Sequence, residues 1–136
     1  MRVLDSIVLV TAANRGIGRQ FVAGLLKRGA RRVYVATRSA ALGPIVALDP
    51  ARVVALQVDI TNRFGVEAAG RPAPDLTPLI NNVGVATFGR ISDTPLDAIV
   101  HDMDTNFFGT LNVVRTFLPI LEPKGQAASV GIDRSC

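Results

Sequence analysis

The first 29 residues constrain the fold more than any other part of the sequence. Residues 2–11 form a nearly continuous run of apolar and β-branched side chains, which is typical of a strand buried on both faces of a parallel sheet. A turn that contains Gly16 and Gly18 follows, and apolar residues then recur at helical spacing until Gly29 can end the helix. A strand, a glycine-rich turn and a helix in this order predict the first half of a βαβ unit.

The same alternation continues along the chain. We expect further strands at 32–37, 52–58, 76–82 and 126–132, and helices at 40–48, 62–70 and 95–121. The last helix has an N-cap at Asp93 or Thr94, and it ends before Pro119 or Pro123 in one or two segments. Strands that alternate with helices at this spacing are joined by right-handed crossovers. The sequence therefore predicts an α/β fold with a doubly wound parallel sheet.

Length and composition limit the class of protein. A chain of 136 residues is enough for one domain, and 49% apolar residues are enough for its core. No apolar run reaches the roughly 18 residues of a membrane-spanning helix, and Asp5 interrupts the one stretch that is similar to a targeting segment. Cys136 is the single cysteine, so we expect no internal disulfide and a reducing, cytoplasmic setting. One histidine and one cysteine also predict the absence of a metal site.

Positive charge is concentrated at the N-terminal end. Residues 1–38 hold eight basic side chains against Asp5 alone, a net charge of +7, whereas residues 39–136 carry a net charge of −3. Such a cationic segment suits nucleic acid, a membrane surface or a phosphorylated small molecule, and it can also be a solvated face. Because nucleic-acid-binding motifs are missing, we expect neither nucleic acid nor a membrane as a partner.

The glycine-rich turn carries the first candidate chemistry. Its sequence is Thr11-Ala12-Ala13-Asn14-Arg15-Gly16-Ile17-Gly18. Between a buried strand and a helix, glycines let the backbone approach a pyrophosphate, and free N–H groups at the helix N-terminus supply positive potential. The alternative is a plain tight connection between the two elements. Its place in the first βαβ unit favours phosphate binding.

Arg38 ends the second predicted strand, twenty residues beyond Gly18. In dinucleotide folds this position carries an acidic group that binds the ribose 2′-hydroxyl of NAD, whereas a cation accommodates the 2′-phosphate of NADP. Here no carboxylate is nearby, and Arg15 faces the same ribose from the first turn. The pair therefore favours NADP over NAD, and the alternative is two solvated arginines.

Four motifs in order resemble the short-chain dehydrogenase/reductase family, in particular its classical cytosolic branch. Thr11–Gly18 is similar to the turn T-G-x-x-x-G-x-G, Asp59-Ile60 follows the third strand, Asn81–Gly84 is similar to N-N-A-G, and Asn106 lies in the long helix. The resemblance covers roughly residues 3–121. It implies a Rossmann-like doubly wound parallel sheet that is truncated after about four or five strands.

The resemblance also implies a domain division and a role for each matching residue. Residues 1–124 would be an incomplete dinucleotide-binding domain, and 125–136 a divergent tail. The cofactor would bind on Thr11, Asn14, Arg15, Gly16, Ile17, Gly18, Arg38, Asp59, Ile60, Asn82 and Gly84. Asp59 and Ile60 would border the adenine, and Asn82 and Gly84 the nicotinamide ribose.

Asn106 would hold an ordered water in the family's proton relay, or else satisfy a kink in the helix. From its apolar neighbours we expect Asn106 at the edge of the buried helix face. We also expect Asp59 and Asn82 to follow neighbouring parallel strands, where ligands bind beyond the carboxyl ends.

Two departures from the family pattern matter for activity. Ala12 replaces the first motif glycine, and we expect a modest loss whose size depends on the local φ. The family's catalytic Ser and Y-x-x-x-K are not found, because the only tyrosine is Tyr34, in the second strand, and the residue four later is Arg38. Ser129 and Ser135 are weak stand-ins for the Ser. We therefore expect an N-terminal portion that is inactive by itself.

These observations favour an NADP-dependent short-chain oxidoreductase, whose intact form moves a hydride between NADP(H) and a carbonyl or secondary alcohol. The alternative is a non-catalytic NADP-binding module or sensor. The family also implies a possible homo-oligomer through the 95–121 helix. We interpret His101 as a surface histidine on an acidic helix face, and Cys136 as no nucleophile because no base is near it in sequence.

Overall fold

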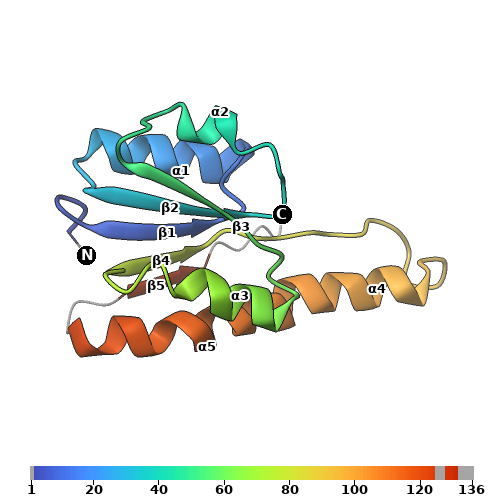
Figure 1. The fold of residues 1–136 in the computed structure, drawn as a ribbon. Helices are drawn as coiled ribbons and strands as arrows, with labels where there is room; N and C mark the ends of the chain where they lie inside the picture. Colours follow the sequence, from blue (N-terminus) through green and yellow to red (C-terminus); the bar gives the residue numbers. More distant parts are fainter. Residues whose placement is uncertain (1, 125–127, 132–136) are drawn as a thin grey trace.

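A five-stranded sheet forms the centre of the computed structural model, which describes residues 2–124 and 128–131 (Figure 1). The strands are β1 (Ile7–Thr11), β2 (Arg32–Thr37), β3 (Val53–Gln57), β4 (Pro78–Asn81) and β5 (Ala128–Gly131). The α-helices are α1 (Gly16–Lys27), α2 (Gly43–Val46), α3 (Arg63–Gly70), α4 (Leu96–Met103) and α5 (Thr110–Leu121). A π-helix, η1 (Asp104–Gly109), joins α4 to α5, and a 3-10 turn, η2 (Glu122–Lys124), follows.

The strands lie in the order β3-β2-β1-β4-β5, and every adjacent pair is parallel. From β1 the chain adds β2 and β3 on one side and then crosses to the other side of β1 for β4. The carboxyl ends of β1 and β4 therefore form the point at which the strand order reverses, where open α/β sheets bind ligands. The predicted doubly wound parallel sheet is confirmed.

The topology corrects one prediction about the candidate site. Asp59 follows β3 and Asn82 follows β4, but β2 and β1 lie between these two strands. Asp59 and Asn82 therefore do not end neighbouring strands. Both residues still lie at the carboxyl edge of the sheet, because all five strands run in the same direction.

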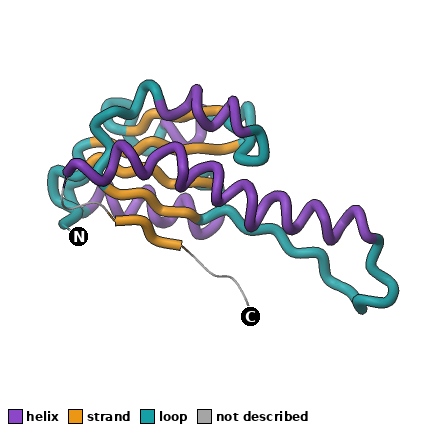
Figure 2. Tube along the Cα trace, turned by 90° about the horizontal axis from the view of Figure 1, so that it is seen from below, coloured by secondary structure: helices purple, strands orange, loops and turns teal. Residues whose placement is uncertain are grey.

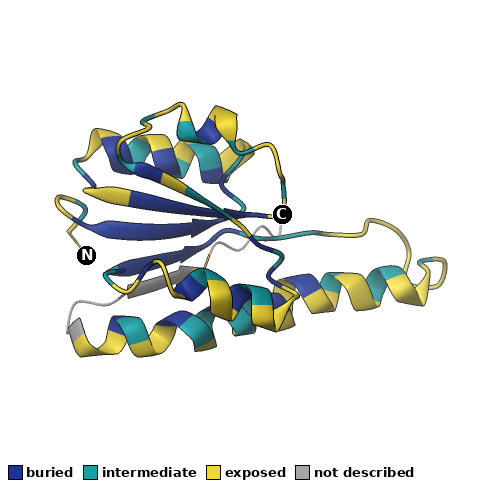
Figure 3. Ribbon diagram, viewed as in Figure 1, coloured by how far each residue is buried: buried dark blue, intermediate teal, exposed yellow. Residues whose placement is uncertain are grey.

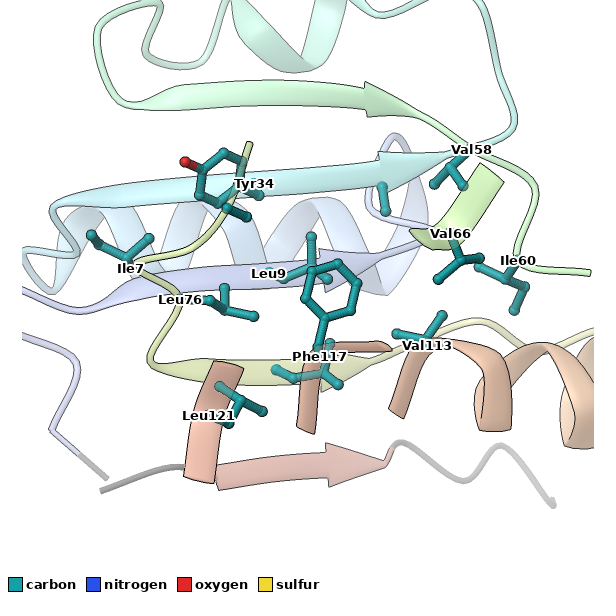
Figure 4. Close-up of a cluster of buried hydrophobic side chains, with 13 residues drawn as sticks. Ile7, Leu9, Tyr34, Val58, Ile60, Val66, Leu76, Val113, Phe117 and Leu121 are labelled. Carbon is teal, nitrogen blue, oxygen red and sulfur yellow. The ribbon is translucent and has the colours of Figure 1, made fainter. Parts of the chain in front are cut away.

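The core consists of two apolar layers, one on each face of the sheet (Figure 3). Ile7 and Leu9 belong to the layer that α3 and α5 cover, where Phe117 of α5 lies against the sheet (Figure 4). Val8 and Val10 belong to the layer that α1 and α2 cover. Because β1 is buried on both sides, alternate residues of its apolar run serve different layers.

Most predicted elements form within a few residues of their expected bounds, with two informative differences. β1 begins at Ile7 because Asp5 adopts a φ of 61° in a turn, where its N–H donates to Gly29 O (2.9 Å). α5 continues through Pro119 and ends at Leu121, so the predicted stop before Pro123 is confirmed and the alternative stop before Pro119 is wrong. Arg115, whose carbonyl loses its usual N–H partner, is exposed, and water can solvate that carbonyl.

Candidate functional site

A cleft of about 700 Å³ opens at the carboxyl edge of the sheet. Its described lining residues are Ala12, Asn14, Arg15, Gly16, Ile17, Ala36, Thr37, Arg38, Ser39, Val58, Asp59, Ile60, Val83, Gly84, Val85 and Thr105. Eight of the predicted cofactor residues are among them: Asn14, Arg15, Gly16, Ile17, Arg38, Asp59, Ile60 and Gly84. We call the segment Thr11–Gly18 the turn wall, and the segments 83–87 and 102–106 together the helix wall.

The turn wall presents the N-terminus of α1 to the cleft. Arg15 is the N-cap residue of α1, and among the described residues no side chain caps the helix and none in its first turn is acidic. The N–H groups of that turn are therefore free of side-chain acceptors and lie at the positive end of the helix dipole. Gly16 has a φ of +54°, which glycine adopts at little cost. These features fit a phosphate group of a dinucleotide.

Ala12, the departure from the motif glycine, has a φ of +51°. In this left-handed region a Cβ atom costs roughly 1–2 kcal/mol relative to glycine. The Ala12 N–H donates to Ala36 O of β2 (2.7 Å), and this bond ties the strained residue to the sheet. The modest loss of activity that we expect from Ala12 in place of the motif glycine therefore has a structural cause, the positive φ of this residue.

Three predicted residues, Thr11, Gly18 and Asn82, do not line the cleft, but contacts among them join the turn wall to the end of β4. Asn82 is fully buried, and its Nδ2 donates to Thr11 O (3.2 Å) and Ala12 O (3.3 Å). The Asn82 N–H donates to Thr11 Oγ1 (2.9 Å). A Cβ atom at Gly18 would lie 2.5 Å from Asn82 Nδ2 and 2.6 Å from Ala12 O. Buried contacts therefore fix the turn to β4.

Charged side chains are distributed unequally around the cleft. Arg15 and Arg38 are both exposed at its rim. Among the described lining residues, Asp59 has the only carboxylate. Partial burial acts to raise the pKa of Asp59, but hydrogen bonds from the Thr61 N–H (2.9 Å) and Oγ1 (2.8 Å) outweigh it, and the pKa is lowered. The charges of Arg38 and His101 act in the same direction.

The helix wall is held by side chains of α4 and η1 that bind the loop after β4, which runs beside these helices (Figure 2). Asn106 accepts from the Val85 N–H (2.9 Å) and donates to Val85 O (2.7 Å). One turn earlier, Asp102 accepts from the Thr87 N–H (2.6 Å) and from Thr87 Oγ1 (3.2 Å). Side chains four residues apart on a helix thus match loop residues two apart in an extended chain.

The position of Asn106 differs from the prediction. It is exposed rather than at the edge of the buried face, whereas its neighbour Thr105 and Gly109 are buried. η1 is a π-helix, whose wider turn changes which residues face the core. Asn106 thus lies in an irregular helix segment, as the kink prediction requires, but its amide bonds to Val85 of the cleft.

Several lining residues were not predicted from the sequence, and the buried polar ones among them are Thr37 and Thr105. The side-chain oxygen of Thr105 is buried with no hydrogen-bond partner among the described residues, whereas Thr37 Oγ1 accepts from the Ser39 N–H (3.2 Å). The one signal in the sequence that could have indicated Thr105 as a cleft residue is its position next to Asn106. Val58, Val83 and Val85 look like ordinary core residues in the sequence, so pattern alone could not assign them to a cleft.

The remaining candidates lie away from the cleft or outside the described residues. Tyr34 is 2% exposed, and its hydroxyl donates to Pro72 O (2.9 Å). His101 is exposed, as predicted. Ser129 lies in β5, where its backbone pairs with Leu79, while Ser135 and Cys136 lie outside the described residues. Across 2–124 and 128–131, no cluster of metal-ligating side chains occurs, and no helix is long and apolar enough to span a membrane.

Comparisons with known proteins point to one family. The family described as short chain dehydrogenase matches residues 6–132. Carbonyl reductase (NADPH) 1 of Bos taurus is 33% identical, over 93% of this chain and 48% of its own. A short chain dehydrogenase from Burkholderia cenocepacia, solved in complex with NADP, is 37% identical with a TM-score of 0.82, over 94% of this chain and 53% of its own.

A second solved structure has a different cofactor. A short chain dehydrogenase/reductase from Burkholderia phymatum, in complex with NAD, is 25% identical with a TM-score of 0.87, over 96% of this chain and 50% of its own. The chain therefore spans about half the length of the relatives it matches. Both nicotinamide dinucleotides thus occur among similar structures.

Proposed function

Because this chain belongs to the short-chain dehydrogenase family, we propose that its cleft binds a nicotinamide adenine dinucleotide and prefers NADP(H) to NAD(H). The bound nicotinamide would supply the hydride chemistry. The protein would then be the cofactor-binding half of an oxidoreductase that acts on a carbonyl or a secondary alcohol. The relatives support the proposal that the chain is one half of such an enzyme, because they are about twice as long as this chain.

One observation carries the cofactor preference. Arg15 and Arg38 lie at the rim of the same cleft as the uncapped N-terminus of α1. A 2′-phosphate beside two guanidinium groups gains charge-assisted hydrogen bonds, whereas the 2′-hydroxyl of NAD would need an acidic partner. Ser39 is a neighbouring hydroxyl, and it also lines the cleft. The name of the bovine relative and the NADP complex support the same preference.

Each predicted residue takes part in this proposal in one of two ways. Those that line the cleft would contact the cofactor, with Gly16 and Ile17 at the pyrophosphate and Gly84 at the nicotinamide ribose. The buried Thr11, Gly18 and Asn82 would act as positioning residues, because their contacts hold the turn wall. Asn106 would also be a positioning residue, because its amide holds the backbone of Val85, which lines the cleft.

We propose that these 136 residues bind the cofactor without turning it over. Tyr34 is the only tyrosine, and it is not among the residues that line the cleft, because its hydroxyl donates to Pro72 O (2.9 Å) elsewhere. A tyrosine proton donor of the family's kind is therefore not available to the cleft within these 136 residues. The same observation favours a second candidate function, a non-catalytic NADP-binding module or sensor. Residues 1–124 would form its binding domain in the cytoplasm, which a single cysteine, Cys136, supports.

The proposal includes a homo-oligomer through α4, η1 and α5. Their exposed apolar side chains are Leu96, Val100, Met103, Phe107, Phe108, Leu111 and Leu118. A contiguous apolar helix face of this kind is typical of a protein interface. Sedimentation velocity should detect a dimer, and a monomer at every concentration would contradict this part.

Calorimetric titration of the purified chain with NADPH and NADH tests the cofactor proposal. We expect saturable binding of NADPH, and in Arg38→Ala a loss of about tenfold or more in NADPH affinity, because a charged hydrogen bond contributes about 1.5–3 kcal/mol. NADH affinity should change little in that variant. Arg71→Ala, at an exposed arginine outside the cleft lining, is the matched control. Equal losses for both cofactors, or no binding by the folded chain, would contradict the proposal.

A further inference from the structure

A second hollow lies along one side of α1, and we call it the α1 groove. Its volume is about 440 Å³, which is within the range of small-molecule sites, about 300–1,000 Å³. Ile17 is the one described lining residue that the α1 groove shares with the cofactor cleft. The α1 groove is therefore a separate surface, which the proposed function does not use.

Apolar side chains form most of the α1 groove. They are Val3, Ile17, Phe21 and Leu25, together with Ile80 of β4. Ile80 is 4% exposed and belongs to the core layer that α1 and α2 cover, whereas Ile17 is 51% exposed. A hydrocarbon that lay on Ile17 would remove this apolar surface from water, which is favourable.

Gly24 keeps the α1 groove open between Ile17 and Arg28. It lies in the interior of α1, where glycine stabilises a helix less than alanine does. A Cβ atom at this position would meet one atom within 4 Å beyond the neighbouring helix backbone, Arg28 Nη1 at 3.2 Å. That atom is the far end of a flexible side chain, so packing within the described residues does not require a glycine here. The open space leaves room for a ligand that lies along the helix.

Arg28 gives one end of the α1 groove a positive charge. Its Nη1 donates to Gly24 O (3.3 Å), which places the guanidinium beside the groove lining. In the described part of the chain Arg28 forms no ion pair, and Asp5 is the only acidic residue among residues 1–38. The other polar side chain of the lining, Gln20, is uncharged. A guanidinium without an anionic partner suits a carboxylate, which it can bind through two N–H groups.

The charge of this surface decides between possible occupants. α1 contains basic residues and no acidic ones, so the α1 helix of a second copy would bring like charges into the groove. A neutral apolar surface would cover the Arg28 guanidinium without giving it a partner, which is costly. An anion with an apolar tail satisfies both the apolar lining and Arg28.

We propose that the α1 groove binds a carboxylate that carries an unbranched hydrocarbon chain. The carboxylate lies on Arg28, and the chain lies against Phe21 and Ile17. From Ile17 to Arg28 the helix rises about 16 Å, so a chain of medium length, such as that of decanoate, covers most of the groove. This inference does not depend on the proposed cofactor, because the groove and the cleft share only Ile17 among their described lining residues.

The test is a titration of the ¹⁵N-labelled chain with decanoate, below the concentration at which decanoate forms micelles. We expect saturable shifts of the backbone amides of Phe21, Gly24 and Arg28, and none at Phe64, which is exposed on α3. Decyltrimethylammonium has a hydrocarbon chain of the same length and a positive head group. It should bind about tenfold more weakly or less, because it cannot accept a hydrogen bond from Arg28.

Three variants separate the head group from the chain. Arg28→Met keeps a long side chain without the guanidinium, and it should lose about tenfold in decanoate affinity. Lys27→Met removes an exposed charge at the next residue, which does not line the groove, and it should bind decanoate as wild type does. Gly24→Leu should remain folded, because a Cβ atom there meets only the end of Arg28. Its side chain fills the groove, so decanoate binding should be lost.

Several results would overturn the inference. They are the absence of saturable decanoate binding, equal affinity for decanoate and decyltrimethylammonium, and unchanged decanoate affinity in Arg28→Met. Shifts at Phe107 and Leu111, on the exposed face of η1 and α5, in place of the groove would also overturn it. If wild type binds NADPH but not decanoate, only this inference fails. If it binds decanoate in the groove but not NADPH, only the proposed function fails.

Discussion

The two walls of the cleft are held in place in different ways. The turn wall is fixed by buried contacts, since Asn82 is fully buried and bonds to Thr11 and Ala12. The helix wall is fixed by Asp102 and Asn106, whose bonds to the loop are exposed to solvent. Buried hydrogen bonds are costly to break because the partner left behind cannot reach water, whereas exposed bonds are replaced by water. The turn wall should therefore tolerate substitution far less than the helix wall.

The largest effect is expected in the turn wall at Gly18. In Gly18→Ala the new Cβ atom would meet Asn82 Nδ2 at 2.5 Å and the backbone atom Ala12 O at 2.6 Å. Because the turn cannot shift without losing its bonds to β4, we expect a loss of about 3 kcal/mol in the free energy of unfolding. NADPH binding should be lost as well. Urea denaturation measures the first change and calorimetry the second.

Gly43→Ala is the matched control for Gly18, because Gly43 lies in α2 and a Cβ atom there would have nothing within 4 Å. We expect that variant to be as stable as wild type or slightly more stable. If the two glycine variants had the same stability, the buried contacts of the turn wall would not be what holds it.

A smaller effect is expected in the helix wall at Asp102. Asp102→Ala removes the acceptor for the Thr87 N–H and Oγ1, but water can replace it at this exposed place. We expect a loss of about 1 kcal/mol in stability and a two- to fivefold loss in NADPH affinity. Asp104→Ala, which removes the same charge at an exposed position two residues later, should leave both unchanged. A loss as large as that of Gly18→Ala would remove the difference between the walls.

Ala12→Gly should strengthen the turn wall. Glycine relieves the cost of a Cβ atom at a φ of +51° but adds chain entropy to the unfolded state, so we expect a net gain of about 0.5–1 kcal/mol. Ala13→Gly, at the next residue, is a control with the opposite sign, because Ala13 has no positive φ and is fully buried. Thermal denaturation of both variants measures the difference. A destabilised Ala12→Gly protein would contradict the backbone geometry of the turn.

The smallest effect concerns pH and Asp59. Hydrogen bonds from Thr61 lower the pKa of Asp59 in the folded protein, so this carboxylate stabilises the fold above its unfolded pKa of about 3.9. That contribution is lost as pH falls through the lowered pKa. The stability difference between wild type and Asp59→Asn should therefore shrink between pH 5 and pH 2. Urea denaturation at several pH values measures it, and a difference that grows with falling pH would indicate a raised pKa.

The sequence predicts the turn wall much better than the helix wall. The turn wall consists of consecutive residues between a strand and a helix, so local patterns contain its glycines and its place at the sheet edge. The helix wall depends on a match between residues 85–87 and 102–106, which no local pattern records. The π-helix at η1 also changes the face on which Asn106 lies, and no residue type announces it. Local patterns do not record the order of the strands in the sheet either, and that order places β2 and β1 between the strands that precede Asp59 and Asn82.

The central claim is that both walls contact one dinucleotide. The most direct measurement is a titration of the ¹⁵N-labelled chain with NADPH, followed through its backbone amide resonances. We predict saturable shifts at Gly16 of the turn wall, at Val85 of the helix wall, and at Ser39, which lines the cleft after β2. Phe64, on the exposed surface of α3, should not shift. Saturation without shifts in one of the two walls, or no shifts in either, would contradict the claim.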